Sequence, residues 1–161
     1  QTTMLATETQ EITDYLRSVM IDVFGEVKIK DHMADTRDTL CYATNDNQSA
    51  TYGLLEESVD LAIVVGGYNS SNTTHLVELL ENKFKTYFIR NEKEIVDKDQ
   101  IYSFNIQDKQ RSLKQNFLPA KQNLTIAITS GASCPDILVD EVIQKIVKLK
   151  ELNSHSFQIN L

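Results

Sequence analysis

The sequence lacks the features that mark membrane, secreted and nucleic-acid-binding proteins. No apolar run approaches the roughly 20 residues that a membrane-spanning helix needs. The formal net charge of −7 argues against a nucleic-acid backbone as the main ligand, because binding that ligand requires a basic protein face. The first ten residues, QTTMLATETQ, contain neither the basic nor the apolar part of a signal peptide. Together these absences predict a cytoplasmic protein.

Cysteine is scarce as well. The chain has two, Cys41 and Cys134, which are too few for a disulfide framework or a closed four-thiolate zinc site. A lone cysteine is more often a buried structural thiol than a functional group. For Cys41 the functional alternatives are a nucleophile activated by a following helix and a single ligand of a metal or cluster. The histidines, His32, His75 and His155, show no metal-ligand spacing.

The familiar nucleotide-binding motifs are missing too. The chain contains neither G-x-x-x-x-G-K-[ST] nor G-x-G-x-x-G, which disfavours a P-loop or a Rossmann dinucleotide site. What the chain does contain is an alternation of strand-like and helix-like segments. That alternation predicts an α/β domain with short parallel sheets flanked by helices, and 161 residues provide enough chain for a real core.

The hydrophobic pattern places these elements along the chain. Helices are expected where apolar residues recur three and four positions apart, at 8–24, 45–58, 74–84 and 137–150. Strands are expected at 27–29, 40–43, 61–65, 86–89 and 124–128. The run 61–65 is apolar throughout, which is typical of a strand covered on both faces. The polar segment 97–116 shows no clear pattern.

Two segments share one pattern: an apolar strand, then a turn that combines glycine with serines, then a helix start. The two turns are GGYNSSNTT at 66–74 and SGASCPD at 130–136. The opening QTTMLATETQ and the stretch CYATNDNQSATYGLL look similar. In a parallel sheet such turns all fall at the carboxyl ends of the strands, where α/β folds bind their ligands.

Helix capping explains part of this composition. Ser, Thr and Asn accept hydrogen bonds from first-turn N–H groups, and Ser133 with Asp136 fits a capping box, with Pro135 in the first helical turn. Capping accounts for one or two such residues per turn, and not for four in a row at 69–72. Helix N-termini also attract anions, and glycine allows close backbone approach. The turns therefore predict a site for a small anionic ligand such as a phosphate or diphosphate.

Four stretches together resemble one family in residue identity, order and spacing. They are QTT at 1–3, DTLCYAT at 38–44, VVGGYNSSNT at 64–73 and TSGASCPD at 129–136. They are similar to the C-terminal half of 4-hydroxy-3-methylbut-2-enyl diphosphate reductase, the LytB-type iron–sulfur enzyme. The form GGYNSSNT is closest to the plant and cyanobacterial branch of that family.

The resemblance implies a reductive dehydroxylation. An allylic diphosphate is converted to isopentenyl and dimethylallyl diphosphate in the last step of the non-mevalonate isoprenoid pathway. The family uses a 4Fe-4S cluster held by three cysteines, and a small electron-transfer protein such as ferredoxin or flavodoxin would supply the electrons. In a plastid-bearing eukaryote the implied location is the plastid stroma.

The resemblance also assigns roles by position. Cys41 resembles the third cluster ligand, and Thr2 resembles the hydroxyl that helps orient the reacting end of the substrate. The diphosphate cradle corresponds to Ser70, Ser71, Asn72 and Ser133. Thr44 resembles a residue near the cluster. Cys134 stands where the family has a small non-ligand residue and receives no role.

The chain also departs from the family. The other two cluster cysteines, the diphosphate-binding histidines and the carboxylate proton donor lie upstream of the QTT stretch, and the chain, which begins without methionine, has none of them. We therefore expect a fragment that is inactive and cluster-free by itself. The resemblance divides it into the end of the family's second α/β unit (1–37), the third unit (38–150) and a tail (151–161).

Two other hypotheses use the same residues. A non-catalytic diphosphate-binding or interaction domain derived from this fold would bind the anion without redox chemistry, even in the full-length protein. A different small-molecule enzyme with Cys41 as its nucleophile would show rapid alkylation of Cys41 and activity that survives iron chelation. No residue near Cys41 in the sequence looks like an activating base, which disfavours that enzyme.

Overall fold

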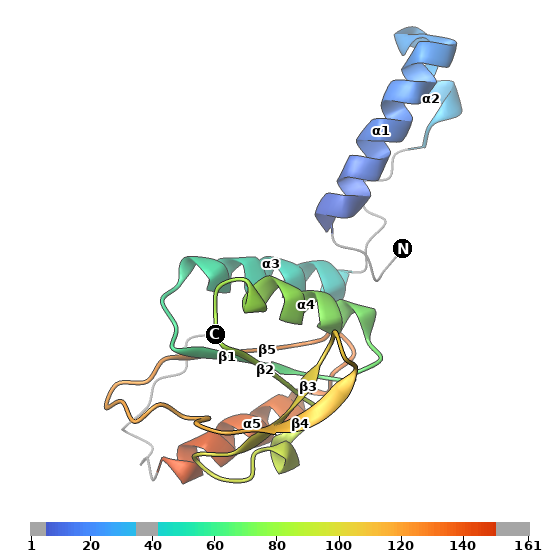
Figure 1. Cartoon of the computed structure of the whole chain (residues 1–161). Helices are drawn as coiled ribbons and strands as arrows, with labels where there is room; N and C mark the ends of the chain where they lie inside the picture. Colours follow the sequence, from blue (N-terminus) through green and yellow to red (C-terminus); the bar gives the residue numbers. More distant parts are fainter. Residues whose placement is uncertain (1–5, 35–41, 151–161) are drawn as a thin grey trace.

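The computed structural model describes residues 6–34 and 42–150 (Figure 1). The helices are α1 (Ala6–Phe24), α2 (Ile29–His32), α3 (Tyr42–Glu56), α4 (Ser71–Glu81) and α5 (Asp136–Leu149), with short 3-10 turns η1 (Glu26–Lys28) and η2 (Glu92–Glu94). The strands are β1 (Leu61–Val65), β2 (Thr86–Ile89), β3 (Ile101–Asn105), β4 (Gln110–Lys114) and β5 (Ile126–Ser130). None of the helices in these ranges is long and apolar enough to cross a membrane.

A parallel sheet of three strands forms the centre of the fold. Its strand order is β2-β1-β5, and β1 lies between two parallel neighbours. In this register Val65, the last residue of β1, lies opposite Ile89 of β2 and Ser130 of β5. The three strands therefore end at one edge, and the turns after β1 and β5 begin side by side. The predicted α/β class, with a short parallel sheet flanked by helices, is confirmed.

Helices cover both faces of this sheet, as the apolar run 61–65 predicts. Successive residues of a strand point to opposite faces, and all five residues of β1 are buried. Leu61, Ile63 and Val65 pack in one cluster with residues of α5. Ala62 and Val64 pack in a second cluster with residues of α4. In Figure 1, α3 and α4 lie together on one side of the sheet, and α5 lies on the other.

The segment 97–116 forms an antiparallel hairpin that the sequence pattern does not indicate. Its strands β3 and β4 pair from Ile101 opposite Lys114 to Asn105 opposite Gln110. The side chain of Asn105 accepts hydrogen bonds from the backbone N–H groups of Gln107 and Asp108, at 2.8 and 3.1 Å, and so stabilises the turn. β4 is largely exposed, so its sequence shows no apolar alternation.

The hairpin is joined to the parallel sheet through β2. The backbone N–H of Phe88 donates a hydrogen bond to Ser103 Oγ of β3 at 3.0 Å, and both residues are buried. Ile101 is fully buried in the core cluster on the α5 side of the sheet. The hairpin is thus anchored beside β2. This strand lies next to β1, which leads into the first glycine-containing turn.

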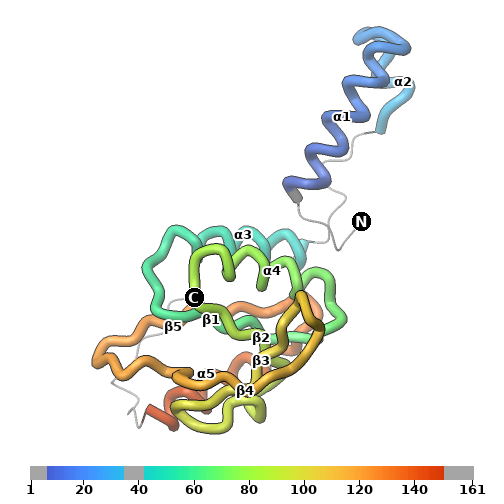
Figure 2. The backbone as a smooth tube through the Cα atoms, in the orientation of Figure 1, coloured from blue at the N-terminus to red at the C-terminus, as the bar shows by residue number. Residues whose placement is uncertain are grey.

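The helices α1 and α2 stand apart from the sheet and its covering helices (Figures 1 and 2). α1 has the predicted amphipathic pattern, but its apolar side chains are exposed: Ile12, Tyr15, Leu16, Val19, Val23 and Phe24 are 40–68% exposed. Phe24 stacks on His32 of α2, with ring centroids 3.8 Å apart. This region therefore packs on itself, whereas the rest of the chain packs around the sheet.

The strand expected at 27–29 is not formed, and this prediction was wrong. Gly25 has a φ of +80°, which only glycine adopts without strain, and it ends α1. The backbone N–H of Lys28 then donates to the carbonyl of Gly25 at 3.2 Å, which closes a 3-10 turn. Val27 is 96% exposed. Three residues with alternating character are too short a signal to define a strand when no neighbouring strand pairs with them in the described ranges.

Several helix and strand boundaries also differ from prediction by a few residues. α3 begins at Tyr42, so the described part of the expected strand 40–43 is helical, and residues 40–41 lie outside the described residues. α4 begins at Ser71, earlier than the predicted 74, and β5 ends at Ser130 rather than at 128. The earlier start of α4 is explained by its cap, which belongs to the site below.

Candidate anion-binding site

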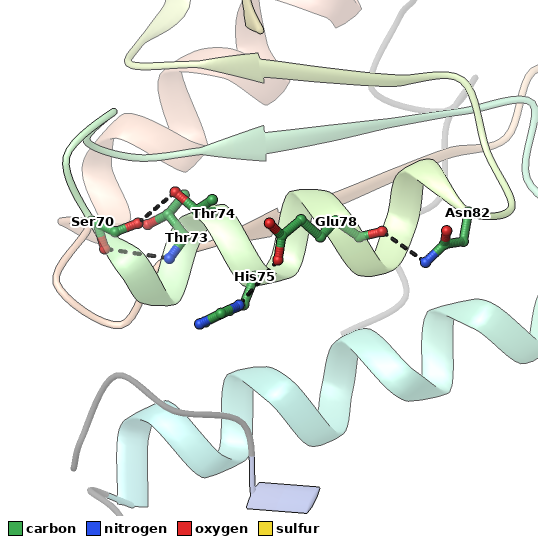
Figure 3. Close-up of polar contacts among 6 residues, drawn as sticks. All are labelled: Ser70, Thr73, Thr74, His75, Glu78 and Asn82. Carbon is green, nitrogen blue, oxygen red and sulfur yellow. Dashed lines mark hydrogen bonds and ion pairs between the residues drawn. The ribbon is translucent and has the colours of Figure 1, made fainter. Parts of the chain in front are cut away.

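The β1–α4 turn (residues 66–70) leads directly into a capped helix. Ser70 is the N-cap of α4, and its Oγ accepts a hydrogen bond from the backbone N–H of Thr73 at 3.3 Å (Figure 3). The carbonyl of Ser70 accepts two more, from the N–H of Thr74 at 2.9 Å and from Thr74 Oγ1 at 3.0 Å. Capping thus uses acceptor lone pairs of the Ser70 hydroxyl and carbonyl oxygens. Its hydroxyl proton remains available as a donor.

Ser71 and Asn72 are the first two residues of α4. The N–H groups of a helix's first turn have no intrahelical partner and carry the positive end of the helix dipole. Ser71 is exposed, whereas the whole residue Asn72 is only 7% exposed. Within the described part of the chain neither Oδ1 nor Nδ2 of Asn72 has a hydrogen-bond partner. A buried amide without partners is unfavourable, so this side chain suits a polar group that the described residues do not supply.

Thr73 joins the two glycine-containing turns. A Cβ added at Gly66 would lie 2.9 Å from Thr73 Oγ1, and one added at Gly131 would lie 2.0 Å from the same atom. The Thr73 side chain therefore occupies the space that both glycines leave open. Its hydroxyl is buried and has no hydrogen-bond partner among the described residues. This contact brings the two turns together, as their place at one sheet edge predicts.

The β5–α5 turn (residues 131–135) is built differently. α5 begins at Asp136 with Pro135 as its N-cap, and no side chain caps the helix. The predicted capping box of Ser133 and Asp136 is therefore wrong, as is the place of Pro135 inside the first helical turn. Ser133 lies two positions before the N-cap and cannot reach the N–H group that a capping side chain binds. It is exposed, and capping does not use its hydroxyl.

The amide-rich helix α3 meets the same region from the side. Asn47 Nδ2 donates to the carbonyl of Ser130 at 2.9 Å, and Thr51 Oγ1 lies 3.2 Å from Thr129 Oγ1. Thr44 is buried. The polar residues of α3 thus attach the helix to the end of β5. This structural role explains part of the polar composition of CYATNDNQSATYGLL, which in the sequence resembles a further ligand-binding turn.

The site contains little charge. The β1–α4 turn and the first turn of α4 hold no charged side chain, and Asp136 is the single one in 130–136. His75 comes next on α4, where its Nδ1 lies 3.1 Å from Glu78 Oε2 (Figure 3). Burial, and secondly the nearby Asp136 carboxylate, raise the pKa of the Cys134 thiol. Cys134 is therefore protonated at neutral pH, which disfavours a nucleophilic role.

The structure places four of the six predicted site residues. Ser70, Ser71 and Asn72 lie together at the start of α4, and Ser133 lies in the neighbouring turn. Thr2 and Cys41 lie outside the described residues. In the ranges 6–34 and 42–150, no three His, Cys, Asp or Glu residues come together to form a candidate metal site.

Two relevant residues were not predicted from the sequence. Thr73 matters because it fills the space beside two glycines, and no local pattern reveals that contact. Tyr68 is the one large side chain in a turn of small residues, and that contrast was a usable signal.

Comparisons with known proteins agree on one family. A family model described as LytB protein matches residues 1–147. Proteins named 4-hydroxy-3-methylbut-2-enyl diphosphate reductase are similar to this chain. The one from Rippkaea orientalis is 40% identical over 157 residues, which are 97% of this chain and 38% of that protein. The one from Gloeobacter violaceus is 40% identical over 151 residues, covering 93% of this chain and 36% of that protein.

A solved structure is also similar. Its title is "Structure of (E)-4-Hydroxy-3-methyl-but-2-enyl Diphosphate Reductase, the Terminal Enzyme of the Non-Mevalonate Pathway". The identity is 28% and the TM-score 0.46, and the match covers 68% of this chain and 32% of that one. The chain thus spans 38% or less of the length of these relatives.

Proposed function

This chain belongs to the LytB protein family, and from that premise we propose that it is the C-terminal portion of a 4-hydroxy-3-methylbut-2-enyl diphosphate reductase. Similar proteins that are more than twice as long carry that name. In the proposed reaction two electrons and two protons enter, and the C–O bond of the allylic hydroxyl breaks. Water leaves, and isopentenyl or dimethylallyl diphosphate forms.

Within this reaction, we propose that the described residues hold the diphosphate. One observation carries the proposal: the buried amide of Asn72 has no partner within the described residues. A diphosphate oxygen at the start of α4 would accept a hydrogen bond from Nδ2 and remove the penalty of leaving that donor unpaired. Ser70 and Ser71 lie on the same turn as Asn72. Ser133, which caps no helix, lies on the neighbouring turn.

A cradle of neutral donors suits this ligand. Hydroxyl and amide groups together with helix N-termini hold an anion without a cationic side chain in the turns themselves. Holding the diphosphate end also fixes the position of the rest of the substrate, and positioning of this kind is a large part of catalysis. The chain's own contribution would thus be binding and orientation.

The described residues do not fit a complete iron–sulfur cluster. They include no group of three potential metal ligands, and the whole sequence has two cysteines. The family resemblance leaves Cys41 as the one proposed ligand from this chain, and Thr2 as the proposed group near the reacting hydroxyl. We propose that the isolated chain is inactive and holds no cluster. Ferredoxin or flavodoxin is the proposed electron donor, and the cytoplasm or plastid stroma the proposed location.

The binding proposal can be tested on this chain directly. Titration of the isotope-labelled chain with inorganic pyrophosphate should shift the amide resonances of 67–73 and 131–134. Asn72→Ala should weaken that binding about tenfold, because a buried donor to the anion is lost. The matched control is Asn82→Ala, at the other end of α4, where Asn82 Nδ2 donates to the carbonyl of Glu78 at 3.0 Å (Figure 3).

Three outcomes are decisive. If pyrophosphate shifts no resonance in either turn, or if both asparagine variants bind equally, the diphosphate site is placed wrongly. A full-length protein that binds pyrophosphate but has no reductase activity would favour the hypothesis of a non-catalytic binding domain. Stoichiometric iron together with turnover in this chain alone would contradict its proposed inactivity.

A further inference from the structure

Tyr68 is set firmly among aromatic and cationic groups although it belongs to a turn of small residues. Its ring stacks on Phe104 of β3, with centroids 4.2 Å apart and planes inclined by 11°. It meets Phe88 of β2 edge-on, with centroids 5.0 Å apart. The guanidinium carbon of Arg90 lies 4.2 Å from the ring centroid, a cation–π contact. The turn is therefore attached to the β2 end and to the hairpin through one side chain.

Glu94 completes this attachment from η2. The residue is only 7% exposed. Its Oε2 accepts hydrogen bonds from the Tyr68 hydroxyl and, at 3.3 Å, from the backbone N–H of Arg90. Its Oε1 lies 3.4 Å from Nε of Arg111 on β4. One buried carboxylate thus links the β1–α4 turn, the end of β2 and the hairpin.

This arrangement is more elaborate than packing alone requires. A buried carboxylate is unfavourable unless donors surround it, and here donors come from three separate segments. Burial and the Glu94 carboxylate raise the pKa of Tyr68, so the phenol keeps its proton and stays a donor. Tyr87 offers a contrast. Its hydroxyl is buried without any partner in the described part, and its ring meets Phe117 edge-on, 5.2 Å between centroids.

Gly66, at the start of the turn, is buried and its backbone N–H donates to the carbonyl of Ile89 at 2.9 Å, whereas the residues next to Tyr68 have no such burial. Gly67 and Asn69, on either side of Tyr68, are both exposed. The backbone N–H of Ser70 donates to the carbonyl of Gly67 at 3.0 Å, so the position of residue 67 affects that of the cap. Movement of Tyr68 would therefore be transmitted through Gly67 to Ser70, the cap of the helix at whose start the diphosphate is proposed to bind.

We propose that Tyr68 and Glu94 are positioning residues for the diphosphate site, and that the β3–β4 hairpin is part of the functional unit because it holds them in place. This inference rests on the proposed function. Neither residue need touch the ligand. Tyr68 holds the turn, Glu94 holds Tyr68, and Arg111 ties Glu94 to the hairpin.

The test compares Tyr68→Phe with Tyr87→Phe in the same chain. Both variants lose one hydroxyl from a ring in contact with a phenylalanine, but Tyr68→Phe also breaks the bond to Glu94. Without ligand, amide hydrogen exchange within 67–70 should become about tenfold faster in Tyr68→Phe at Ser70, whose N–H donates to the carbonyl of Gly67, and stay unchanged in Tyr87→Phe. The dissociation constant for inorganic pyrophosphate should rise about tenfold in Tyr68→Phe, in line with the loss of a charge-assisted hydrogen bond that orders the turn.

Glu94→Gln supplies the second arm of the test. Alone it should weaken pyrophosphate binding as Tyr68→Phe does. In the Tyr68→Phe background it should add little, because Glu94 acts through Tyr68. A structural role unrelated to the turn would instead give additive losses together with unchanged exchange at 67–70.

The proposed function and the positioning role of Tyr68 fail separately. If the wild-type chain does not bind pyrophosphate at these turns, the proposed function falls and the positioning role falls with it. If the wild-type chain binds and Tyr68→Phe binds equally well, the positioning role alone is overturned. Faster exchange at 67–70 with weaker binding in Tyr68→Phe, and neither change in Tyr87→Phe, supports it.

Discussion

The β1–α4 and β5–α5 turns both combine glycine with serine but have very different structures. In the first, Ser70 caps the helix, Tyr68 is anchored in an aromatic cluster and Asn72 is buried. In the second, no side chain caps the helix, and Ser133 is exposed beside a half-buried Cys134. Glycine and small polar residues therefore define where a turn lies and not how firmly it is built.

The difference has a physical origin in the way each helix starts. α4 packs its first turn against both glycines, so its start is fixed by contact. α5 starts after Pro135, an N-cap without a side-chain hydrogen-bond acceptor, and Ser133 lies two positions before it. In the proposed site, the first turn would be a preformed half and the second would supply an exposed hydroxyl next to it. Substitutions in the two turns can test that division of roles.

The largest effect is expected where the two turns touch. Gly131→Ala would place a Cβ 2.0 Å from Thr73 Oγ1, so the Thr73 side chain, α4 or β5 must shift. We expect a loss of about 3 kcal/mol in the free energy of unfolding, as for overpacking of a tight interior, measured by urea denaturation. Gly67→Ala is the control, because nothing lies within 4 Å of its added Cβ. Its expected change is within about 0.5 kcal/mol.

The same contact allows a rescue. Thr73→Ala removes the hydroxyl that the new methyl group would strike, so the double variant Gly131→Ala/Thr73→Ala should regain most of the lost stability. If the losses of unfolding free energy from the two changes simply added, the clash between the turns would not be what destabilises Gly131→Ala. Contact between the turns would then not explain why α4 has a fixed start.

Asn72→Ala should separate stability from binding. The variant removes two buried polar atoms that have no partner among the described residues, so the free energy of unfolding should stay equal or rise by about 1 kcal/mol. Pyrophosphate affinity should nevertheless fall about tenfold. Thermal unfolding with and without pyrophosphate measures both. A destabilised variant with unchanged affinity would make Asn72 an ordinary core residue.

Much of the fold could be predicted because its signals are local. The apolar run 61–65 and the apolar residues three and four apart at 137–150 indicate a covered strand and an amphipathic helix. The hairpin could not be predicted, since β4 exposes most of its side chains and shows no alternation. α1 was predicted as a helix, but its sequence does not show that its apolar face is exposed in the described structure.

The site divides in the same way. Ser70, Ser71 and Asn72 could be predicted from their run of small polar residues after a strand. The link from Tyr68 to Glu94 could not, because the two residues are 26 positions apart and neither lies in a pattern that points to the other. The capping box at Ser133 was wrong because the helix begins at Asp136, which makes Pro135 the N-cap, and residue types alone do not show where a helix begins.

A direct comparison of the two turns comes from removing one serine hydroxyl at a time. Ser70→Ala removes the N-cap of α4 and should cost about 1 kcal/mol of unfolding free energy. Ser133→Ala removes an exposed hydroxyl that caps nothing, so the change should stay within about 0.5 kcal/mol. Urea denaturation distinguishes the two. Equal losses would mean that both serines stabilise their helices, and the two turns would then be alike.

The smallest effect concerns the thiol of the second turn. Burial, and then the charge of Asp136, raise the pKa of Cys134, so at neutral pH it holds less thiolate than a free thiol. Its alkylation by iodoacetamide, monitored at this site by mass spectrometry, should therefore be slower in the folded chain than in urea. The pH at which it accelerates should lie above that of the unfolded chain. Asp136→Asn should increase the folded rate about twofold to threefold by removing the lesser cause. Alkylation of folded Cys134 that is faster than in urea would reveal an activated thiol, and the second turn would then carry chemistry that its open structure does not indicate.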